Sequence, residues 1–447
     1  MKKFLLLLIL LTIVVSLPVS AFAENEENIE EVEVLVEENV YVPEEEAPVV
    51  PTEEEKIEQT SIVMPSQAKG IHLTTRAAAS SYHKPRIDDL LDNTELNTLV
   101  IDVKEIDGEL SIKGVAKDLA YSPKLPSVEK YLKEVKNRGF YTIARIVVFR
   151  DNVMPRKRPD LAVKNPDGSL WEDYKGHTWL NPYKQGTIDY ILELSEKSAA
   201  MGFDEIQFDY IRFPSDGKTK QCRYGVNHSS TTASAAIVNF LKQAKERLSV
   251  SGIKTSIDVF GLTTTDTSGM GIGQRLVEMA KYVDYVSPMI YPSHYNNGEY
   301  GIDNPNKEPY RTVYIALQGA KKRIPAEKLR PWLQDFSMKG VKYGPEEIKA
   351  QIQACYDCDV KTWLLWNAAC KYTKDGLKTK EEQDTYKKSS EEKINELLKH
   401  KTVDESILKR APLKPKPNTA TNTASTKPAQ NKPAQAKTKP ASQAKNK

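Results

Sequence analysis

Residues 187–214 read TIDYILELSEKSAAMGFDEIQFDYIRFP and contain, in order, an amphipathic segment, a glycine and an apolar run. The spacing of the apolar residues predicts a helix over 187–201, which Gly202 is suited to end. The run at 205–210 has the length and composition of a buried strand. A helix that leads straight into such a strand is one half of a βαβ unit, in which the strands run parallel.

The same alternation continues on both sides of this stretch. Eight repeats over about 300 residues predict an α/β fold with a single (β/α)8 TIM barrel. A doubly wound open sheet is the alternative, but residues 73–76, LTTR, contain no glycine-rich phosphate turn after the first strand. The expected strands are 70–74, 98–104, 141–149, 205–210, 254–261, 285–292, 329–336 and 361–368. The expected helices are 86–95, 128–138, 187–201, 235–250, 272–282, 310–323 and 345–356.

Residues 1–23 have the pattern of a signal peptide. A positive start, MKK, precedes an apolar run at 4–17, and Ala21-Phe22-Ala23 forms a small-x-small cleavage site. An uncleaved membrane anchor is the alternative, but the run is shorter than the roughly 20 apolar residues that span a bilayer. We therefore expect cleavage after Ala23 and a secreted or cell-wall-associated protein with no stable membrane span.

Charge divides the mature chain into an acidic arm, a barrel and a basic tail. Residues 24–58 hold fifteen Glu and one Lys, and residues 411–447 hold eight Lys and no acid. Both ends have few large apolar residues, so we expect disorder at 24–66 and 401–447 and a folded barrel domain at 67–400. The tail is expected to adhere to anionic wall polymers or to act as a solubilising spacer. Because the tail has no interleaved aromatic residues, we expect no nucleic-acid binding. We also expect the protein to be a monomer.

The four cysteines are too few for a disulfide scaffold in an exported chain of this length. Cys355 and Cys358 have i, i+3 spacing and Cys370 follows, but His400 is too distant to complete a zinc site with them. We expect buried small residues, or one incidental disulfide, and neither a metal nor an organic cofactor.

In a barrel of this kind, functional side chains lie at the C-terminal ends of the strands and in the following loops. These positions hold acids, arginines and aromatic residues, a mixture that suits sugars because polar groups bind hydroxyls while rings pack on C–H faces. A structural Asp102–Lys104 ion pair and simple packing of Trp179 are the alternatives for those residues. The substrate-binding candidates are Asp102, Lys104, Arg145, Trp179, Gln207, Arg212, Tyr291, Gln334 and Trp366.

The catalytic candidates are Asp209 and Asp258, near the ends of the fourth and fifth strands. Glycosidic cleavage needs one protonated and one ionised carboxyl group. Neighbouring parallel strands lie ~5 Å apart, so both acids could reach one bond. Arg145 and Arg212 are expected to keep Asp209 ionised, because a nearby cation lowers a carboxyl pKa. Alternatively, Asp258 only supports Asp209 or a tyrosine.

Three segments carry a resemblance to a known family: GFDEIQFDYIRFP at 202–214, NTLVIDVKEIDG at 97–108 and WLLWNA at 363–368. Residues 68–375 resemble a family of exported bacterial and archaeal TIM-barrel proteins, which is assigned to the glycoside hydrolases largely from its fold. That family is similar in turn to amylase-like barrel glycosidases. The resemblance implies that Asp209 is the nucleophile or base.

The fourth strand departs from the DxxDxDxE pattern of substrate-assisted chitinases. The four aligned positions are Asp204, Gln207, Asp209 and Ile211, so the position of the catalytic Glu is apolar. The general acid must therefore come from another strand, and Asp258 is the first choice, with Asp102 or Glu105 in reserve.

The predicted function is hydrolysis of O-glycosidic bonds in a cell-wall or extracellular polysaccharide by two carboxyl groups. A catalytically silent barrel that binds such a glycan is the alternative. A metal-dependent deacetylase is disfavoured, because the six histidines contain no HxxxH-type pair.

Overall fold

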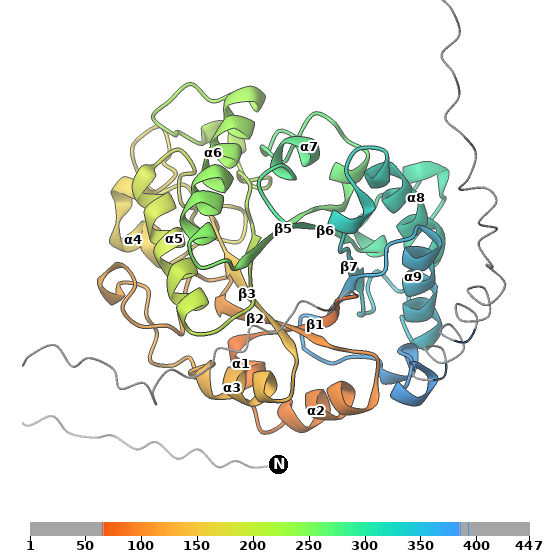
Figure 1. The fold of residues 1–447 in the computed structure, drawn as a ribbon. Coiled ribbons are helices and arrows are strands. Elements are labelled where there is room, and N and C mark those ends of the chain that lie inside the picture. Colours follow the sequence, from red (N-terminus) through yellow and green to blue (C-terminus); the bar gives the residue numbers. More distant parts are fainter. Residues whose placement is uncertain (1–64, 66, 384, 386–391, 393–447) are drawn as a thin grey trace, which may run out of the picture. The chain divides into compact units, whose positions relative to one another are not determined.

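The computed structural model describes residues 65, 67–383, 385 and 392. Eight parallel strands pair in chain order and close into a barrel, with β8 against β1 (Figure 1). The predicted (β/α)8 barrel is confirmed. The expected signal peptide and basic tail, and the acidic arm apart from residue 65, lie outside the described residues. The strands are β1 Lys69–Leu73, β2 Thr98–Lys104, β3 Tyr141–Val147, β4 Glu205–Asp209, β5 Lys254–Phe260, β6 Tyr285–Ile290, β7 Trp332–Gln334 and β8 Trp363–Trp366.

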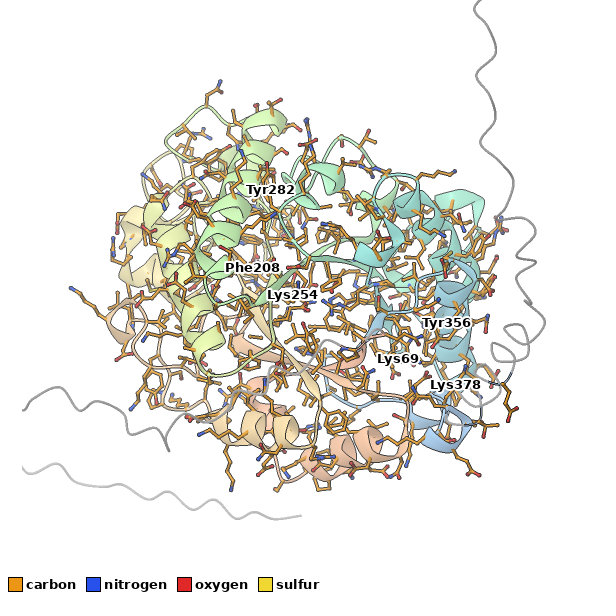
Figure 2. All side chains as sticks on the ribbon, in the orientation of Figure 1. Lys69, Phe208, Lys254, Tyr282, Tyr356 and Lys378 are labelled. Atoms are coloured by element: carbon orange, nitrogen blue, oxygen red, sulfur yellow. The ribbon has the colours of Figure 1, made fainter. Side chains whose placement is uncertain are left out.

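Helices follow the strands and lie outside the ring of strands (Figure 1). Phe208 of β4 shows how the two layers meet, because its ring packs edge-on against Phe240 of α6 with the centroids 5.1 Å apart (Figure 2). In the part of the chain that the structure describes, no helix is both long and apolar enough to cross a membrane. The helices are α1 Thr75–Ala78, α2 Lys84–Asn93, α3 Glu129–Asn137, α4 Met154–Lys157, α5 Gln185–Ala200, α6 Ser230–Ser249, α7 Leu276–Met279, α8 Pro309–Lys321 and α9 Pro345–Asp357.

Three elements differ from the predicted ranges. Helix α6 begins five residues before the expected 235, because Ser229 and Thr232 form a capping box at its start. Helix α7 is a single turn rather than 272–282, since three glycines at 269–273 have positive φ angles that suit turns. Strand β7 is shorter than 329–336 because Pro331, just before it, has no N–H to donate to a ladder.

The interior of the barrel is filled by side chains rather than open (Figure 2). Near the N-terminal ends of the strands, Arg330 pairs with Glu205, and the Tyr141 hydroxyl donates to Glu205 at 3.0 Å. All three side chains are buried. This polar layer closes the lower half of the barrel, so the acids at the C-terminal ends lie above a solid base.

Candidate active site

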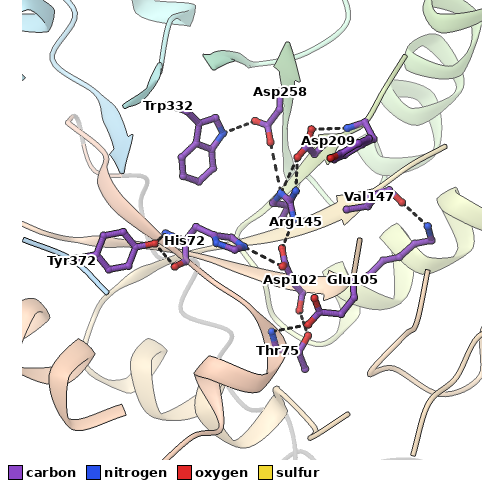
Figure 3. A network of polar contacts seen from close by, with 12 residues as sticks. His72, Thr75, Asp102, Glu105, Arg145, Val147, Asp209, Asp258, Trp332 and Tyr372 are labelled. Carbon is purple, nitrogen blue, oxygen red and sulfur yellow. Dashed lines mark hydrogen bonds and ion pairs between the residues drawn. The ribbon is translucent and has the colours of Figure 1, made fainter. Parts of the chain in front are cut away.

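Arg145, on β3, is the centre of a cluster of three carboxyl groups (Figure 3). Its Nη1 donates to Oδ1 of Asp102 at 2.6 Å, and its Nε donates to Oδ2 of Asp209 at 3.1 Å. The same Nε lies 3.9 Å from Oδ2 of Asp258. One buried guanidinium therefore collects acids from β2, β4 and β5.

Asp209 ends β4 and is 4% exposed. Its Oδ2 receives Nη2 as well as Nε of Arg145, and its Oδ1 accepts the backbone N–H of Tyr210 at 2.6 Å. Tyr210 has φ +49°, a left-handed conformation that is uncommon for a residue other than glycine. Such conformations concentrate at functional sites. Here the turn directs an N–H at the carboxylate, so three N–H groups donate to the two oxygens of Asp209.

Asp258, on β5, is 1% exposed and has a different environment. Burial raises its pKa well above the usual range, and the negative charge of Asp209 raises it further. Arg145 offsets this only in part, and the indole N–H of Trp332 donates to Oδ1 of Asp258 at 2.7 Å. Neighbouring acids with such different surroundings are suited to different protonation states.

The two acids are close enough to act on one bond. Because Oδ2 of Asp209 and Oδ2 of Asp258 lie 3.1 Å and 3.9 Å from the same nitrogen, they are at most about 7 Å apart. Retaining glycosidases separate their carboxyl groups by about 5–5.5 Å and inverting ones by about 6.5–9.5 Å. The upper bound fits a retaining site or the shortest inverting one.

His72, on β1, belongs to the cluster although the sequence did not suggest it. Its Nε2 lies 3.0 Å from Oδ2 of Asp102, and its ring stacks on Trp366 at a centroid distance of 4.0 Å. Its Nδ1 is buried and has no hydrogen-bond partner among the described residues. The only sequence sign was a polar residue inside the buried strand KGIHL.

Asp102 and Glu105, the reserve acids, differ in charge. Burial would raise the pKa of Asp102, but Arg145 and His72 outweigh it and the pKa is lowered. The half-buried carboxyl of Glu105 has a raised pKa, from burial and from the charge of Asp102, and accepts the N–H of Thr75 at 3.1 Å. Of these two, Glu105 is better suited to hold a proton.

Comparison with known families decides the class of this site. A family model described as "Putative glycosyl hydrolase domain" matches residues 70–372. The chain belongs to this family. It is thus an enzyme of the glycoside hydrolase class, and the resemblance inferred from its strands is confirmed.

Solved structures that are similar to this glycosyl hydrolase include the PgaB (BpsB) glycoside hydrolase domain from Bordetella bronchiseptica. That domain is 12% identical, with a TM-score of 0.53, over 68% of this chain and 95% of its own. A hypothetical protein from Ruminiclostridium thermocellum is 34% identical over 42% of this chain and 97% of its own, with a TM-score of 0.38. No curated protein matches. The likeness to the Bordetella domain shows a shared fold.

Two predicted binding residues lie beside the acids of this glycosyl hydrolase. Tyr291 is buried, and its pKa is raised by burial and by the charges of Asp258 and Asp209, so its neutral phenol lies near both. The half-buried ring of Trp366, at the end of β8, has the guanidinium carbon of Arg145 4.9 Å from its centroid. Both rings therefore lie close to the acid cluster.

Arg212 lies near Asp209 without bonding to it. Its guanidinium lies 4.7–5.0 Å from the ring centroids of Trp179, Tyr210 and Phe260 and donates to the carbonyl of Phe213 at 3.1 Å. The contact expected to hold Asp209 ionised therefore comes from Arg145. Buried Trp179 packs under Arg212, in agreement with the packing alternative.

Lys104 does not contact the three acids around Arg145, and the Asp102–Lys104 pair, the alternative to a binding role, does not form. A register shift after Asp102 in β2 turns Lys104 toward Asp151, with which it forms a fully buried pair at 2.9 Å. Burial lowers the pKa of Lys104. Lys104 also donates to the carbonyls of Val147 and Arg150, so it stabilises the chain at the end of β3 and just after it.

The predicted glutamines are also buried supports. Gln207 lies in the barrel interior, where its Nε2 is 3.4 Å from Oγ of Ser287. Gln334 accepts the N–H of Ser293 and donates to the carbonyl of Phe336, joining the loops after β6 and β7. Neither amide faces the acid pair directly.

The cysteines form no disulfide bond among the described residues. All four cysteines are buried and unpaired. No group of three or more His, Cys, Asp and Glu within the described ranges is arranged to hold a metal ion.

A cavity of about 670 Å³ opens beside the N-terminal ends of β5, β6 and β8, where Thr255, Tyr285 and Thr362 line it. It lies at the end of the barrel opposite to the acids.

Proposed function

We propose that this glycosyl hydrolase cleaves O-glycosidic bonds of a cell-wall or extracellular polysaccharide with Asp209 and Asp258 as its two carboxyl groups. The observation that carries the proposal is the contrast between them. Asp209 receives a guanidinium and a backbone N–H, whereas burial and the charge of Asp209 raise the pKa of Asp258. The first carboxyl suits an ionised role and the second a protonated one.

In this mechanism, Asp258 gives its proton to the departing glycosidic oxygen. The carboxylate that results is stabilised by the Trp332 N–H and by Arg145. Asp209 either attacks the anomeric carbon or takes a proton from an attacking water. In both cases its negative charge opposes the positive charge that develops on the sugar ring.

Export to the cell surface is the second part of the proposal. Its support is the sequence of the ends: the signal-peptide pattern of residues 1–23 and the eight lysines of 411–447. A polysaccharide at the surface is a substrate that an exported hydrolase would meet.

The test is release of reducing sugar from a panel of wall and matrix polysaccharides. We expect Asp209→Asn and Asp258→Asn each to lower turnover by about 10² to 10⁴-fold, because each removes acid or base assistance. Asp189→Asn, an exposed aspartate on α5, is the matched control and should retain full activity.

Wild-type turnover by Asp209→Asn would disprove the site. Binding of a polysaccharide without release of sugar from any member of the panel would instead favour a glycan-binding barrel.

A further inference from the structure

A second cavity, of about 460 Å³, opens at the same end of the barrel as the acids. It lies between the α1–α2 segment, which follows β1, and the loop that follows β8. Thr74 and Ala368, which line it, are each two residues beyond a member of the acid cluster, His72 and Trp366 respectively. Since an extended residue spans about 3.3 Å, each lies within about 7 Å of the cluster along the chain.

The two walls of this cavity are fixed to the acid cluster. Tyr372, in the loop after β8, accepts the N–H of His72 at 3.1 Å and donates to its carbonyl at 2.5 Å (Figure 3). The same His72 bonds to Asp102 and stacks on Trp366. A ligand in the cavity would therefore be held at a constant position relative to the acids.

The charge of the cavity is positive. Its lining contains Arg76 and Lys371 and no acidic side chain. The Arg76 side chain is 59% exposed, and its nearest carboxylate, that of Glu109, is 3.7 Å away at the surface. Within the described ranges, Lys371 has no salt-bridge partner and lies 5.7 Å from the ring centroid of Tyr82. Arg76 also donates to the carbonyl of Lys124 at 3.3 Å, so an incoming anion would share Arg76 with two exposed surface contacts.

The cavity also offers an aromatic ring. Tyr82 is 49% exposed although it is a large aromatic residue, and the Arg86 guanidinium lies 4.0 Å from its centroid. His83 also lines the cavity, and its buried Nδ1 has no partner among the described residues. An aromatic ring suits a sugar, and the cations suit an acidic substituent on it.

We propose that this basic cavity, lined by Arg76, Tyr82, His83 and Lys371, is a subsite for a sugar that carries an anionic group. This inference rests on the proposed function, because it assigns the cavity to a neighbouring unit of the same polysaccharide. The anionic group is a carboxylate or a phosphate, since both accept hydrogen bonds from arginine and lysine. The subsite would make the hydrolase selective for acidic polysaccharides.

The test measures binding, so that it does not depend on hydrolysis. Calorimetric titration compares a galacturonate trisaccharide, its carboxyl-reduced neutral counterpart and a 6-phosphorylated maltotriose. We expect at least one acidic probe to bind about 10-fold more tightly than the neutral one at low ionic strength. The advantage should shrink as salt screens the charges. Comparison of the two acidic probes distinguishes a carboxylate site from a phosphate site.

Variants place the binding in the cavity. Arg76→Gln and Lys371→Gln should each remove about 10-fold of the affinity for the acidic probe and leave affinity for the neutral probe unchanged. Lys349→Gln, on the outer face of α9, is the matched control and should have no effect. Tyr82→Ala should lower the affinity for both the acidic and the neutral probe.

Equal binding of acidic and neutral probes, no binding of any probe, or an unchanged affinity in Arg76→Gln and Lys371→Gln would each overturn the subsite. Asp209→Asn separates the two proposals, because it should abolish hydrolysis and leave acidic-probe binding intact. If wild type hydrolyses a polysaccharide without any preference for acidic probes, the proposed function survives and the subsite does not.

Discussion

Arg145 gives Asp209 and Asp258 different chemistry although they lie on adjacent strands. Two N–H groups of Arg145 donate to Asp209. Asp258 lies 3.9 Å from Arg145 and instead accepts a hydrogen bond from the neutral indole of Trp332. A guanidinium stabilises a carboxylate more than an indole does, so the hydrogen-bond partners of the two acids differ in kind. The acid and the base of the proposed mechanism are thus separated by their hydrogen-bond partners rather than by their residue type.

The sequence allowed part of this cluster to be predicted. Asp209, Asp258 and Arg145 could be found because each interrupts an apolar strand, and a buried charge needs a partner. His72 was missed because its stacking on Trp366 joins residues almost 300 positions apart. The pair of Lys104 with Asp151 was not foreseen by either interpretation of this lysine, substrate binding or a pair with Asp102, since the register shift in β2 depends on the loop beyond it and leaves no mark in the alternation of side chains.

The raised pKa of Asp258 predicts the alkaline limb of the pH profile. As pH rises through that pKa, the general acid ionises and kcat/KM should fall. Trp332→Phe removes an N–H that stabilises the ionised form, so the pKa should rise further and the alkaline limb should move to higher pH. The measurement is the pH dependence of kcat/KM for both proteins on a polysaccharide that the wild type cleaves.

Trp363→Phe is the control for this change. Trp363 is also a buried tryptophan of a barrel strand, but its indole donates to Tyr356 at 3.3 Å, away from the acids. The alkaline limb of the pH profile of Trp363→Phe should therefore lie at the same pH as that of the wild type. An alkaline limb that does not move in Trp332→Phe would mean that another group supplies the proton, with Glu105 the next candidate.

At the scale of elements, the strands were easier to predict than the helices and loops. A parallel strand covered on both faces is mostly apolar, as β2 and β3 are apart from a few polar residues, so its composition identifies it. Helix α7 was mispredicted because its apolar residues satisfy a helical spacing while three glycines at 269–273 divide the segment into turns. The glycines thus limit α7 to a single turn although the spacing of its apolar residues is helical.

The close approach of β5 and β6 depends on Gly261, which follows β5. A Cβ at this position would lie 2.6 Å from the carbonyl oxygen of Met289 and would also clash with the Tyr295 hydroxyl. We expect Gly261→Ala to lower the free energy of unfolding by about 1–3 kcal/mol, because a backbone atom must move. It should also lower turnover, since β5 carries Asp258. Urea denaturation and the reducing-sugar assay measure the two effects.

Gly139→Ala is the comparison for this variant. Gly139 has φ +82°, but a Cβ at this position would have nothing within 4 Å of it. The cost of the substitution therefore comes from backbone conformation alone, and turnover should stay unchanged. If Gly261→Ala were as active as Gly139→Ala, the spacing of β5 and β6 would not control the position of Asp258.

At the scale of the whole molecule, we propose that adhesion to the cell wall and catalysis belong to different regions of the chain. The eight lysines of 411–447 are accompanied by no acid, so their attraction to an anionic polymer should be screened over ~8 Å at physiological salt. A chain that ends at Arg410 should keep its hydrolytic activity but lose most of its retention on anionic wall material at low salt. Sedimentation with isolated wall material measures retention. Equal retention of both chains would assign adhesion to the barrel.

The stability of the barrel should depend on pH in opposite ways through Asp102 and Asp258. Asp258 keeps its proton in the folded state after the unfolded chain has lost it, so its contribution to stability falls as pH rises from about 4 toward its raised pKa. Asp102 has a lowered pKa, so its contribution is present above about pH 4 and is lost as pH falls through the folded value.

Two variants separate these effects by calorimetry between pH 4 and pH 8. Relative to wild type, the Tm of Asp258→Asn should rise with increasing pH, because the variant no longer loses stability when the unfolded carboxyl ionises. Asp102→Asn should lower the Tm by a nearly constant amount between pH 4 and pH 8, because the wild-type carboxyl is ionised in both the folded and the unfolded chain there, and the difference should shrink only below about pH 4. Since about 1 kcal/mol moves Tm by about 2–4 °C in a domain of 150–250 residues, both effects are measurable. A Tm difference for Asp258→Asn that stayed as level as that of Asp102→Asn would show that the folded protein does not hold a proton on Asp258, and its assignment as the proton donor would lose its physical basis.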